Sequence, residues 1–340
     1  MSTPGAALTG GAAKASCAVQ NSSALTPSRL VAALLSNAQS AHPRTADAQC
    51  ATTARAMAIH VDDVGMCHGA NKAFIELSRS GGVTCGSVMV PCPWFREIAD
   101  AARDDPSLDL GVHLTLTSEW PHYRWGPIST RAVESGLVDE QGCFPRNILA
   151  LRPQLIERGA RAIEAAEIEF RAQIDRAFDA GIDVTHLDTH MGAAVIPELV
   201  NIYVKLGREY RLPILLPREL DSYTGVLKMG DVDQSLYPPI VDELDARNEP
   251  VFERFRMTPW VASDQAEAKY REMIETLPAG ATFFAIHANA PGDIETIVPP
   301  RAHFRTDEYA LFGTGAPRRW AENAGIRLIG MREVRDLLRG

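Results

Sequence analysis

The stretch AMAIHVDDVG, residues 56–65, decides the expected fold of this chain. Its first six residues form a nearly continuous apolar run, which is typical of a strand buried on both faces of a sheet. The run ends in Asp62 and Asp63, and helical spacing of apolar residues follows over 71–77, closed by a pair of glycines. The sequence therefore predicts a buried strand that presents two acidic side chains at its carboxyl end and leads into a helix.

A strand followed by a helix recurs along the rest of the chain. Alternation of this kind indicates a parallel sheet, and about seven such units over some 285 residues favour a (β/α) barrel in a single domain over an open sheet. No Gly-x-Gly-x-x-Gly follows the first strand and no Walker loop is present, so the fingerprints of nucleotide-binding folds are missing. The later strands are predicted at 83–90, 108–114, 184–187, 213–216, 281–287 and 326–329.

Three segments between the strands have features of their own. The clearest helix is predicted over 156–180, and we expect its buried side to include Ile163 and Phe178. Residues 115–145 have no clean periodicity and are interpreted as an active-site loop. Residues 221–259 are irregular apart from one short predicted helix.

The overall composition limits the kinds of partner. The chain has 340 residues, 46% hydrophobic and 23% charged, with a net charge of −9. A moderately acidic chain is a poor general binder of nucleic acid or anionic membrane, and no apolar stretch approaches the ~20 residues that span a bilayer. Six cysteines without a Cys-x-x-Cys pair predict reduced thiols and a cytoplasmic protein.

The first 52 residues differ from the rest of the chain. They are rich in Ala, Ser, Thr and Gly, and large apolar residues are scarce outside Leu30–Leu35. Such a segment buries too little apolar surface to offset its ordering entropy, so we predict a disordered extension over 1–52 and the barrel domain over 53–340. A targeting segment is the alternative, since acidic residues are scarce and Ser and Ala abundant, as in transit peptides.

Histidines and aspartates recur where the predicted strands end. Asp62 and Asp63 end the first strand, His113 the third, and His287 a late one. In a parallel barrel these ends open on one face, which is where active sites lie. Taken singly, each residue has a structural interpretation, such as a helix cap for the aspartates or a hydrogen-bonded core position for His113. Their joint occurrence favours a metal site.

The stretch THLDTH, residues 185–190, adds two histidines and an aspartate. In an extended chain residues i, i+2 and i+4 share one face, so His186, Asp188 and His190 are expected to point inward together. Two histidines with a carboxylate are a common set of catalytic metal ligands that leaves positions open for water or substrate. The remaining histidines, among them His60, fall outside this pattern and are interpreted as structural.

Several motifs occur in an order and spacing that a known family shares. They are VDDVG at 61–65 with Gly69 and Asn71, GVHL at 111–114, and THLDTH. Together they resemble the motifs of the YdjC-like carbohydrate deacetylases, and His287 takes the position of a late histidine of that family, without the proline that follows it there. The resemblance covers the chain from about residue 56 onward. It implies a deformed, TIM-like (β/α) barrel and a hydrolase that removes acetyl groups from N-acetylated sugars.

The resemblance also implies a metal-dependent mechanism. One divalent ion, with magnesium or zinc expected, would polarise the acetamide carbonyl and activate water. Acetate and a free amino sugar would be the products. The implied roles are metal ligands for Asp63, His113 and His190, general base for Asp62, general acid for His287, and orientation of the ligands for His186 and Asp188.

The segment at 117–125 within the long loop is distinctive. Sugars present apolar faces that stack on Trp and Tyr, and hydroxyls that bond to Glu and Arg, so the segment suits a saccharide substrate. Alternatively, the loop folds onto the barrel with its tryptophans buried, and the sequence leaves both interpretations open. The candidate substrate-binding residues are Glu119, Trp120, Tyr123, Arg124 and Trp125.

Other functions stay open at this point. A non-haem iron oxygenase uses the same two histidines and carboxylate, but usually on an antiparallel fold, against which the β-α alternation argues. A non-catalytic sugar-binding barrel would not need both aspartates and all the histidines. A metal-dependent hydrolase of another substrate also fits the ligands. An N-acetylated saccharide is the expected partner, and a homodimer is a hypothesis without a sequence signal.

Overall fold

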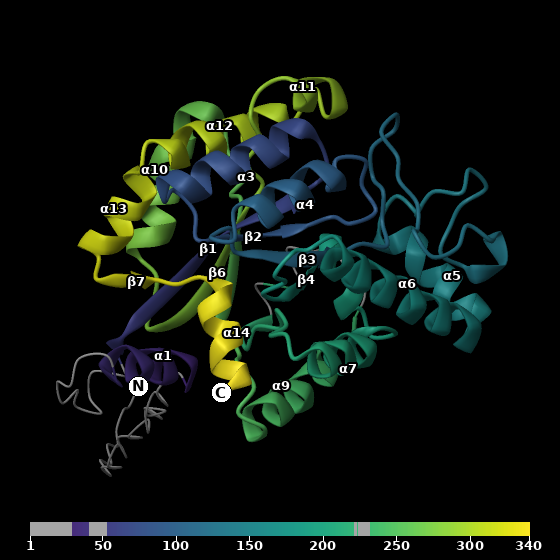
Figure 1. The fold of residues 1–340 in the computed structure, drawn as a ribbon, viewed down its shortest axis with the longest axis horizontal. Coiled ribbons are helices and arrows are strands. Elements are labelled where there is room, and N and C mark those ends of the chain that lie inside the picture. Colours follow the sequence, from purple (N-terminus) through teal and green to yellow (C-terminus); the bar gives the residue numbers. More distant parts are fainter. Residues whose placement is uncertain (1–28, 41–52, 221–222, 224–231) are drawn as a thin grey trace, which may run out of the picture.

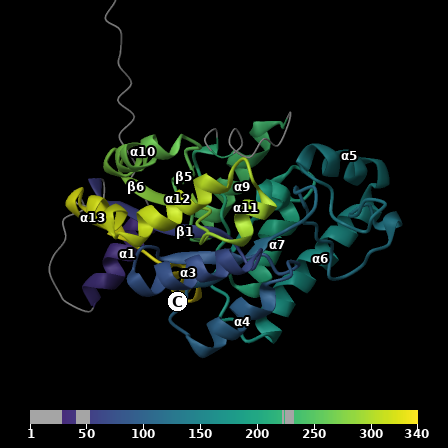
Figure 2. The same cartoon turned by 90° about the horizontal axis from the view of Figure 1, so that it is seen from above.

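The structure is a computed structural model, and it describes residues 29–40, 53–220, 223 and 232–340. A seven-stranded, entirely parallel sheet forms its centre, in the order β4-β3-β2-β1-β6-β5 with β7 also paired to β1. Figure 1 shows helices around the outside of this sheet, and Figure 2 shows the same arrangement from above. The strands are β1 (Arg55–Val64), β2 (Cys85–Val88), β3 (Leu110–Leu114), β4 (Leu187–Thr189), β5 (Arg254–Met257), β6 (Gly280–Ile286) and β7 (Ile326–Leu328).

Helices alternate with the strands, as the sequence predicts. The first crossover helix ends where Gly81 adopts the left-handed conformation (φ 73°), which glycine reaches without steric strain because it lacks a Cβ atom. The helices are α1 (Arg29–Ser40), α3 (His68–Ser80), α4 (Phe95–Asp104), α5 (Ile148–Arg158), α6 (Ala160–Asp179), α7 (Val200–Tyr210), α9 (Tyr237–Ala246), α10 (Ser263–Glu275), α11 (Asp293–Ile297), α12 (Ala302–Gly313), α13 (Ala316–Asn323) and α14 (Met331–Arg339).

The first apolar run forms the central strand, β1. It pairs with β6 over Arg55–Val61, while its opposite edge is shared by β7 at the beginning and β2 at the end. Every residue of β1 after Arg55 is buried. The run at 56–61 therefore lies in the middle of the core, and the α/β fold with about seven parallel strands in a single domain is confirmed.

The sheet forms a half-barrel because pairing becomes irregular between β4 and β5. The strand expected at 213–216 is reduced to one bridge between Leu187 and Ile214. Further along, the backbone N–H groups of 218–219 donate to the carbonyls of 252–253, just ahead of β5. The prolines at positions 213 and 217, on either side of residues 214–216, lack backbone N–H groups and cannot continue a regular β-ladder. Single hydrogen bonds thus span the open side of the barrel.

One strand, β5, lies in a region for which the sequence predicts no strand. Its four residues, RFRM, contain two arginines, so no apolar run marks them. Arg254 is nevertheless 4% exposed, because its guanidinium donates to the backbone carbonyls of Pro278 and Ala279. A buried arginine satisfied by distant carbonyls leaves no local signal in the sequence.

The long helix predicted over 156–180 is two helices, α5 and α6, separated at Gly159 (φ 57°). The middle of α6 is buried as expected, but Ile163 is half-buried and Phe178 is 37% exposed. The ring of Phe178 stacks on Tyr210 with 6.1 Å between centroids. The prediction of a buried Phe178 is therefore wrong, since the ring finds an aromatic partner at the surface.

Residues 29–40 form helix α1, which contradicts the prediction of disorder for this part of the N-terminal extension. Leu30, Val31 and Leu34 are buried, and α1 packs against β6 and α14 (Figure 1). The patch is short, but its spacing puts three apolar side chains on one helix face. The rest of the predicted extension lies outside the described residues, and the domain boundary at 52/53 stays a prediction.

Two further expectations concern membrane spans and thiols. Among the helices that the structure describes, none combines the length and the apolar character that crossing a bilayer requires. Four cysteines lie in the described ranges and are free thiols, namely Cys67, Cys85, Cys92 and Cys143. The expectation for Cys17 and Cys50 falls outside those ranges.

Candidate active site

The candidate site begins with an irregularity at the end of β1. The pairing of β1 with β2 shifts between Val61 and Val64, and Asp63 adopts a left-handed backbone conformation (φ 62°). Adjacent residues of a regular strand point to opposite faces, whereas a bulge re-aims side chains. Asp62 and Asp63 consequently both reach the interior, where they are 9% and 1% exposed.

Asp63, His113 and His190 converge in one buried cluster at the carboxyl ends of the strands. Asp63 lies in β1, His113 in β3, and His190 directly follows β4. Asp63 Oδ1 is 3.1 Å from His190 Nδ1 and 3.5 Å from His113 Nε2, and one donor atom of each residue lies within 4.8 Å of the others. One carboxylate and two imidazoles this close together fit a divalent metal ion. The structure thus brings together the three residues that the resemblance implies as ligands.

Each histidine of this cluster has a carboxylate on its other ring nitrogen. His113 Nδ1 lies 2.9 Å from Asp188 Oδ1, and His190 Nε2 lies 3.0 Å from Glu119 Oε2. Such partners fix the tautomer and orientation of an imidazole that binds metal. Burial alone lowers the pKa of His190, but Glu119 and Asp63 outweigh it and raise this pKa to about 10. Glu119 therefore contacts a candidate ligand, although the sequence suggested a sugar contact for it.

His60, which the sequence pattern leaves aside, connects Asp62 to His186. His60 Nδ1 lies 2.7 Å from Asp62 Oδ1, and its Nε2 lies 2.9 Å from His186 Nε2. Burial, followed by the neighbouring His60, lowers the pKa of His186 to about 3, so this imidazole is neutral. With Asp188, these two histidines also bring three donor atoms together, but a hydrogen bond between the imidazoles accounts for their approach. His186 thus supports the partner of Asp62.

His287 directly follows β6 and faces Asp62. Its Nε2 is 3.8 Å from Asp62 Oδ2, and its Nδ1 is 2.8 Å from Thr258 Oγ1. The Thr258 hydroxyl donates its single proton to Glu308 Oε1 at 2.6 Å, so its oxygen accepts from the Nδ1–H of His287. Glu308 also accepts from the backbone N–H of His287 at 2.7 Å. This chain of contacts assigns the proton of neutral His287 to Nδ1 and leaves Nε2 facing Asp62.

Three residues of this region have no signal in the strand-end motifs. Arg305 is buried and its Nη2 donates to Asp63 Oδ2 at 2.7 Å. Burial, followed by the Arg305 cation, lowers the pKa of His287 to about 4, whereas burial raises the pKa of Glu308 to about 7. Arg305 and Glu308 lie three residues apart on α12, and only the fold shows that this helix face meets the site. Thr258 is hidden because β5 itself is not predicted.

The loop expected to bind sugar folds largely onto the protein. Trp125 is 3% exposed, and its indole N–H donates to a backbone carbonyl at 2.8 Å. The Tyr123 hydroxyl also donates to a backbone carbonyl, and Arg124 pairs with Asp139 at 2.7 Å. Trp120 is half-buried. Trp125 is therefore a core residue, which agrees with the second of the two interpretations, a loop folded onto the barrel with its tryptophan buried.

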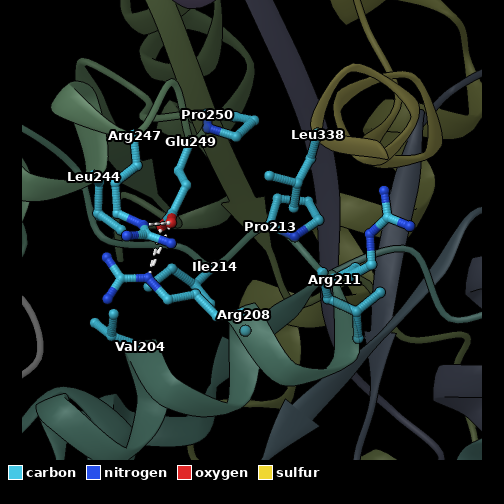
Figure 3. A pocket seen from close by; sticks show the side chains of 12 residues that line it. Val204, Arg208, Arg211, Pro213, Ile214, Leu244, Arg247, Glu249, Pro250 and Leu338 are labelled. Atoms are coloured by element: carbon cyan, nitrogen blue, oxygen red, sulfur yellow. Dashed lines mark hydrogen bonds and ion pairs between the residues drawn. The ribbon is translucent and has the colours of Figure 1, made fainter. Parts of the chain in front are cut away.

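A cavity of about 150 Å³ lies elsewhere, between α7, the end of α9 and α14. Figure 3 shows Arg208 and Arg247 at its wall, both paired with Glu249, and Leu338 opposite them. None of the histidines and aspartates described above lines this cavity. The hollow in Figure 3 is thus separate from the candidate site.

Comparison with known proteins gives a consistent assignment. The model of a family described as "YdjC-like protein" matches residues 56–323. A carbohydrate deacetylase of Thermus thermophilus is 33% identical over 259 residues, which are 76% of this chain and 86% of that protein. A carbohydrate deacetylase of Brevibacillus brevis is 32% identical over 162 residues, 47% of this chain and 58% of the relative.

A solved structure supports the fold. The crystal structure of a candidate cellobiose-phosphate cleavage protein of Enterococcus faecalis superimposes with a TM-score of 0.62, covering 83% of this chain and 99% of that one, at 21% sequence identity. At this identity the likeness concerns the fold alone. The family match, by contrast, includes β1, β3, THLDTH and His287 in one continuous span. The chain therefore belongs to the YdjC-like family.

Proposed function

We propose that this protein is a metal-dependent deacetylase that removes the acetyl group from an N-acetylated sugar. The observation that carries the proposal is the position of Asp62, which adjoins Asp63 of the metal cluster and lies 3.8 Å from His287. Amide hydrolysis needs a base for the attacking water and a proton for the departing amine. The relative from Thermus thermophilus, named carbohydrate deacetylase, supports the same chemistry.

In this proposal Asp63, His113 and His190 hold one divalent ion, magnesium or zinc. When bound, the ion supplies a Lewis acid that polarises the acetamide carbonyl and lowers the pKa of water. Asp188 and Glu119 hold the two imidazoles in the tautomers that leave His113 Nε2 and His190 Nδ1 directed toward Asp63. Imidazole nitrogens favour zinc and carboxylate oxygens suit magnesium, so metal analysis decides between them.

Asp62 removes a proton from the attacking water. His60 occupies Asp62 Oδ1 at 2.7 Å and leaves Oδ2 for the side that faces His287. His186 holds the second nitrogen of His60, so the imidazole that supports the base cannot turn away. His186 thus acts on the orientation of the base, through His60.

His287 delivers the proton to the departing amine. Its pKa of about 4 keeps it neutral at pH 7 before the reaction, so the proton must reach it during the reaction. Asp62 Oδ2, 3.8 Å from Nε2, is placed to pass on the proton taken from water. Thr258 and Glu308 stabilise the imidazolium that forms, because Nδ1–H stays hydrogen-bonded throughout. Acetate and a free amino sugar are the products.

Metal analysis of the purified protein, followed by an acetate-release screen over N-acetylated mono- and oligosaccharides, tests this function. We expect one divalent ion per chain and acetate release that stops on chelation. Asp63→Asn should lose the ion, whereas Asp62→Asn should keep it and lose kcat by a factor on the order of 10². Metal loss in both variants would contradict the assignment, and turnover that consumes oxygen would indicate the oxygenase instead.

Two finer points belong to the same proposal. A cytoplasmic location is supported by the free thiols among the described residues, and fractionation of cells that make the protein tests it. A homodimer remains a hypothesis, for which analytical ultracentrifugation is the direct measurement.

A further inference from the structure

Trp260 is an exposed aromatic residue beside the candidate site. It lies in the segment that follows β5, the residue is 45% exposed, and its backbone is left-handed (φ 51°). Its ring lies 5.5 Å from the imidazole of His287, tilted by 42°. The ring also meets Phe304 of α12 edge to face, with 5.3 Å between centroids and a 90° interplanar angle.

A left-handed backbone and an exposed aromatic ring are both unfavourable for folding, so their combination at Trp260 suggests a functional role. A bulky residue with positive φ is a genuine outlier that persists only where its surroundings hold it in place, and such outliers cluster at functional sites. Nearly half of this large aromatic residue is also exposed to solvent. Among the exposed large hydrophobic side chains of the described ranges, Trp260 is the one whose ring contacts a candidate catalytic residue.

The chemistry of the leaving group gives the direction in which the sugar lies. In deacetylation the sugar carries the departing nitrogen, so the group that protonates this nitrogen must lie on the sugar side of the acetamide. That group is His287 in the proposed function. The sugar ring therefore sits next to His287, and the exposed aromatic surface at that place is Trp260.

We propose that Trp260, supported by Phe304, is the platform on which the pyranose ring of the amino sugar stacks. The proposal rests on the proposed function, because it uses His287 as the proton donor. The indole offers a rigid apolar surface for the C–H face of a sugar. The sugar subsite is thus formed by the segment after β5 and by α12, and not by the loop at 117–125.

The chain provides a matched control in Trp94. This tryptophan is 39% exposed and its ring lies 5.3 Å from a histidine, His68, so its surroundings resemble those of Trp260. It follows β2, whereas Trp260 follows β5, with β1 and β6 between them in the sheet. A general effect of removing an exposed indole would appear equally in both.

The test compares Trp260→Ala, Trp260→Phe and Trp94→Ala on N-acetylglucosamine, chitobiose and an activated acetyl ester without a sugar ring. We expect Trp260→Ala to raise KM for the sugars by roughly tenfold and to leave hydrolysis of the ester within twofold. Trp260→Phe should recover part of the loss, and Trp94→Ala should match the wild type. An unchanged KM, or a fall in kcat alone, would overturn the platform, because the indole would then act only through His287.

A binding measurement separates this proposal from the function on which it rests. The indole ¹H–¹⁵N signal of Trp260, assigned by its loss in Trp260→Phe, is followed while chelated protein is titrated with glucosamine or N-acetylglucosamine. Saturable movement of this signal, with the Trp94 signal unmoved, supports the platform even if no sugar releases acetate, which would refute the deacetylase function alone. Acetate release from sugars with an unmoved Trp260 signal would refute the platform alone.

Discussion

The loop at 117–125 and the segment at 258–262 both follow strand ends, yet they use their aromatic residues differently. The loop contains two tryptophans and a tyrosine in nine residues and buries Trp125 in the core. The other segment contains the single Trp260, exposed beside His287. Aromatic density in a sequence therefore indicates packing as readily as ligand binding. What distinguishes the two is the surroundings of each ring, which only the fold supplies.

Replacement of His287, the residue beside Trp260, by alanine should have the largest effect of these changes, and it should be an effect on kcat. Metal content and fold should be retained, because the cluster of Asp63, His113 and His190 does not include His287. We expect kcat on an N-acetylated sugar to fall by roughly two to four powers of ten, the range for loss of a proton donor. An activated acetyl ester, whose leaving group needs no proton, should slow far less. Equal slowing of both substrates would instead place His287 at the metal or the oxyanion.

The Trp125→Ala variant should unfold more easily, because this tryptophan of the loop belongs to the hydrophobic core. Truncation of a buried tryptophan typically costs about 3 to 5 kcal/mol of unfolding free energy, and urea denaturation measures it. Trp260→Ala is the matched surface variant and should lower the same quantity by only about 1 kcal/mol, because nearly half of this residue is already exposed. A stable Trp125→Ala protein with a raised KM for sugars would show that the loop at 117–125 binds the substrate.

The pKa of Glu308 predicts a pH-dependent stability on the His287 side. Since its pKa is raised from 4.5 to about 7, the folded chain holds this proton more tightly than the unfolded chain. Stability from this group is complete below pH 4.5 and falls as the pH rises toward 7, by roughly 3 kcal/mol in all. The effect is isolated by subtracting the unfolding free energy of the Glu308→Gln variant from that of the wild type at each pH. A difference that does not vary over this range would show that Glu308 is already ionised when the chain is folded.

Glu119→Gln should give the smallest change, and it should concern the metal. Because Glu119 holds His190 Nε2, its loss should weaken metal affinity by about 10- to 100-fold, as for other residues that orient metal ligands. At saturating metal the KM for sugars should stay near that of the wild type. Glu134→Gln, at an exposed position of the same loop, serves as the control. A raised KM with normal metal affinity would mean that Glu119 binds the sugar.

The sequence predicts best what depends on neighbours along the chain. The apolar run before Asp62 indicates the central strand, and period-two spacing places His186, Asp188 and His190 on one buried face. The same spacing relates His60 to Asp62, so this contact could be predicted in principle.

Contacts between distant segments are a different matter. Arg305 lies 242 residues from Asp63, and Thr258 lies 29 residues from His287. Neither pair leaves a periodic pattern, because each contact exists only when the strands have been placed side by side. Trp260 is hidden for a related reason, since one tryptophan after a short arginine-rich strand has no repeating context.

The bulge in β1 also means that residues 62 and 63 are constrained in different ways during evolution. Residue 63 stands in a conformation that glycine, asparagine and aspartate tolerate and that β-branched residues avoid. A library selected for folding alone should therefore accept fewer residue types at position 63 than at position 62, which has no positive φ. Selection for acetate release would then restrict the residue types accepted at position 62 as well. The two aspartates would look equally invariant in a functional screen, although the backbone conformation constrains only residue 63.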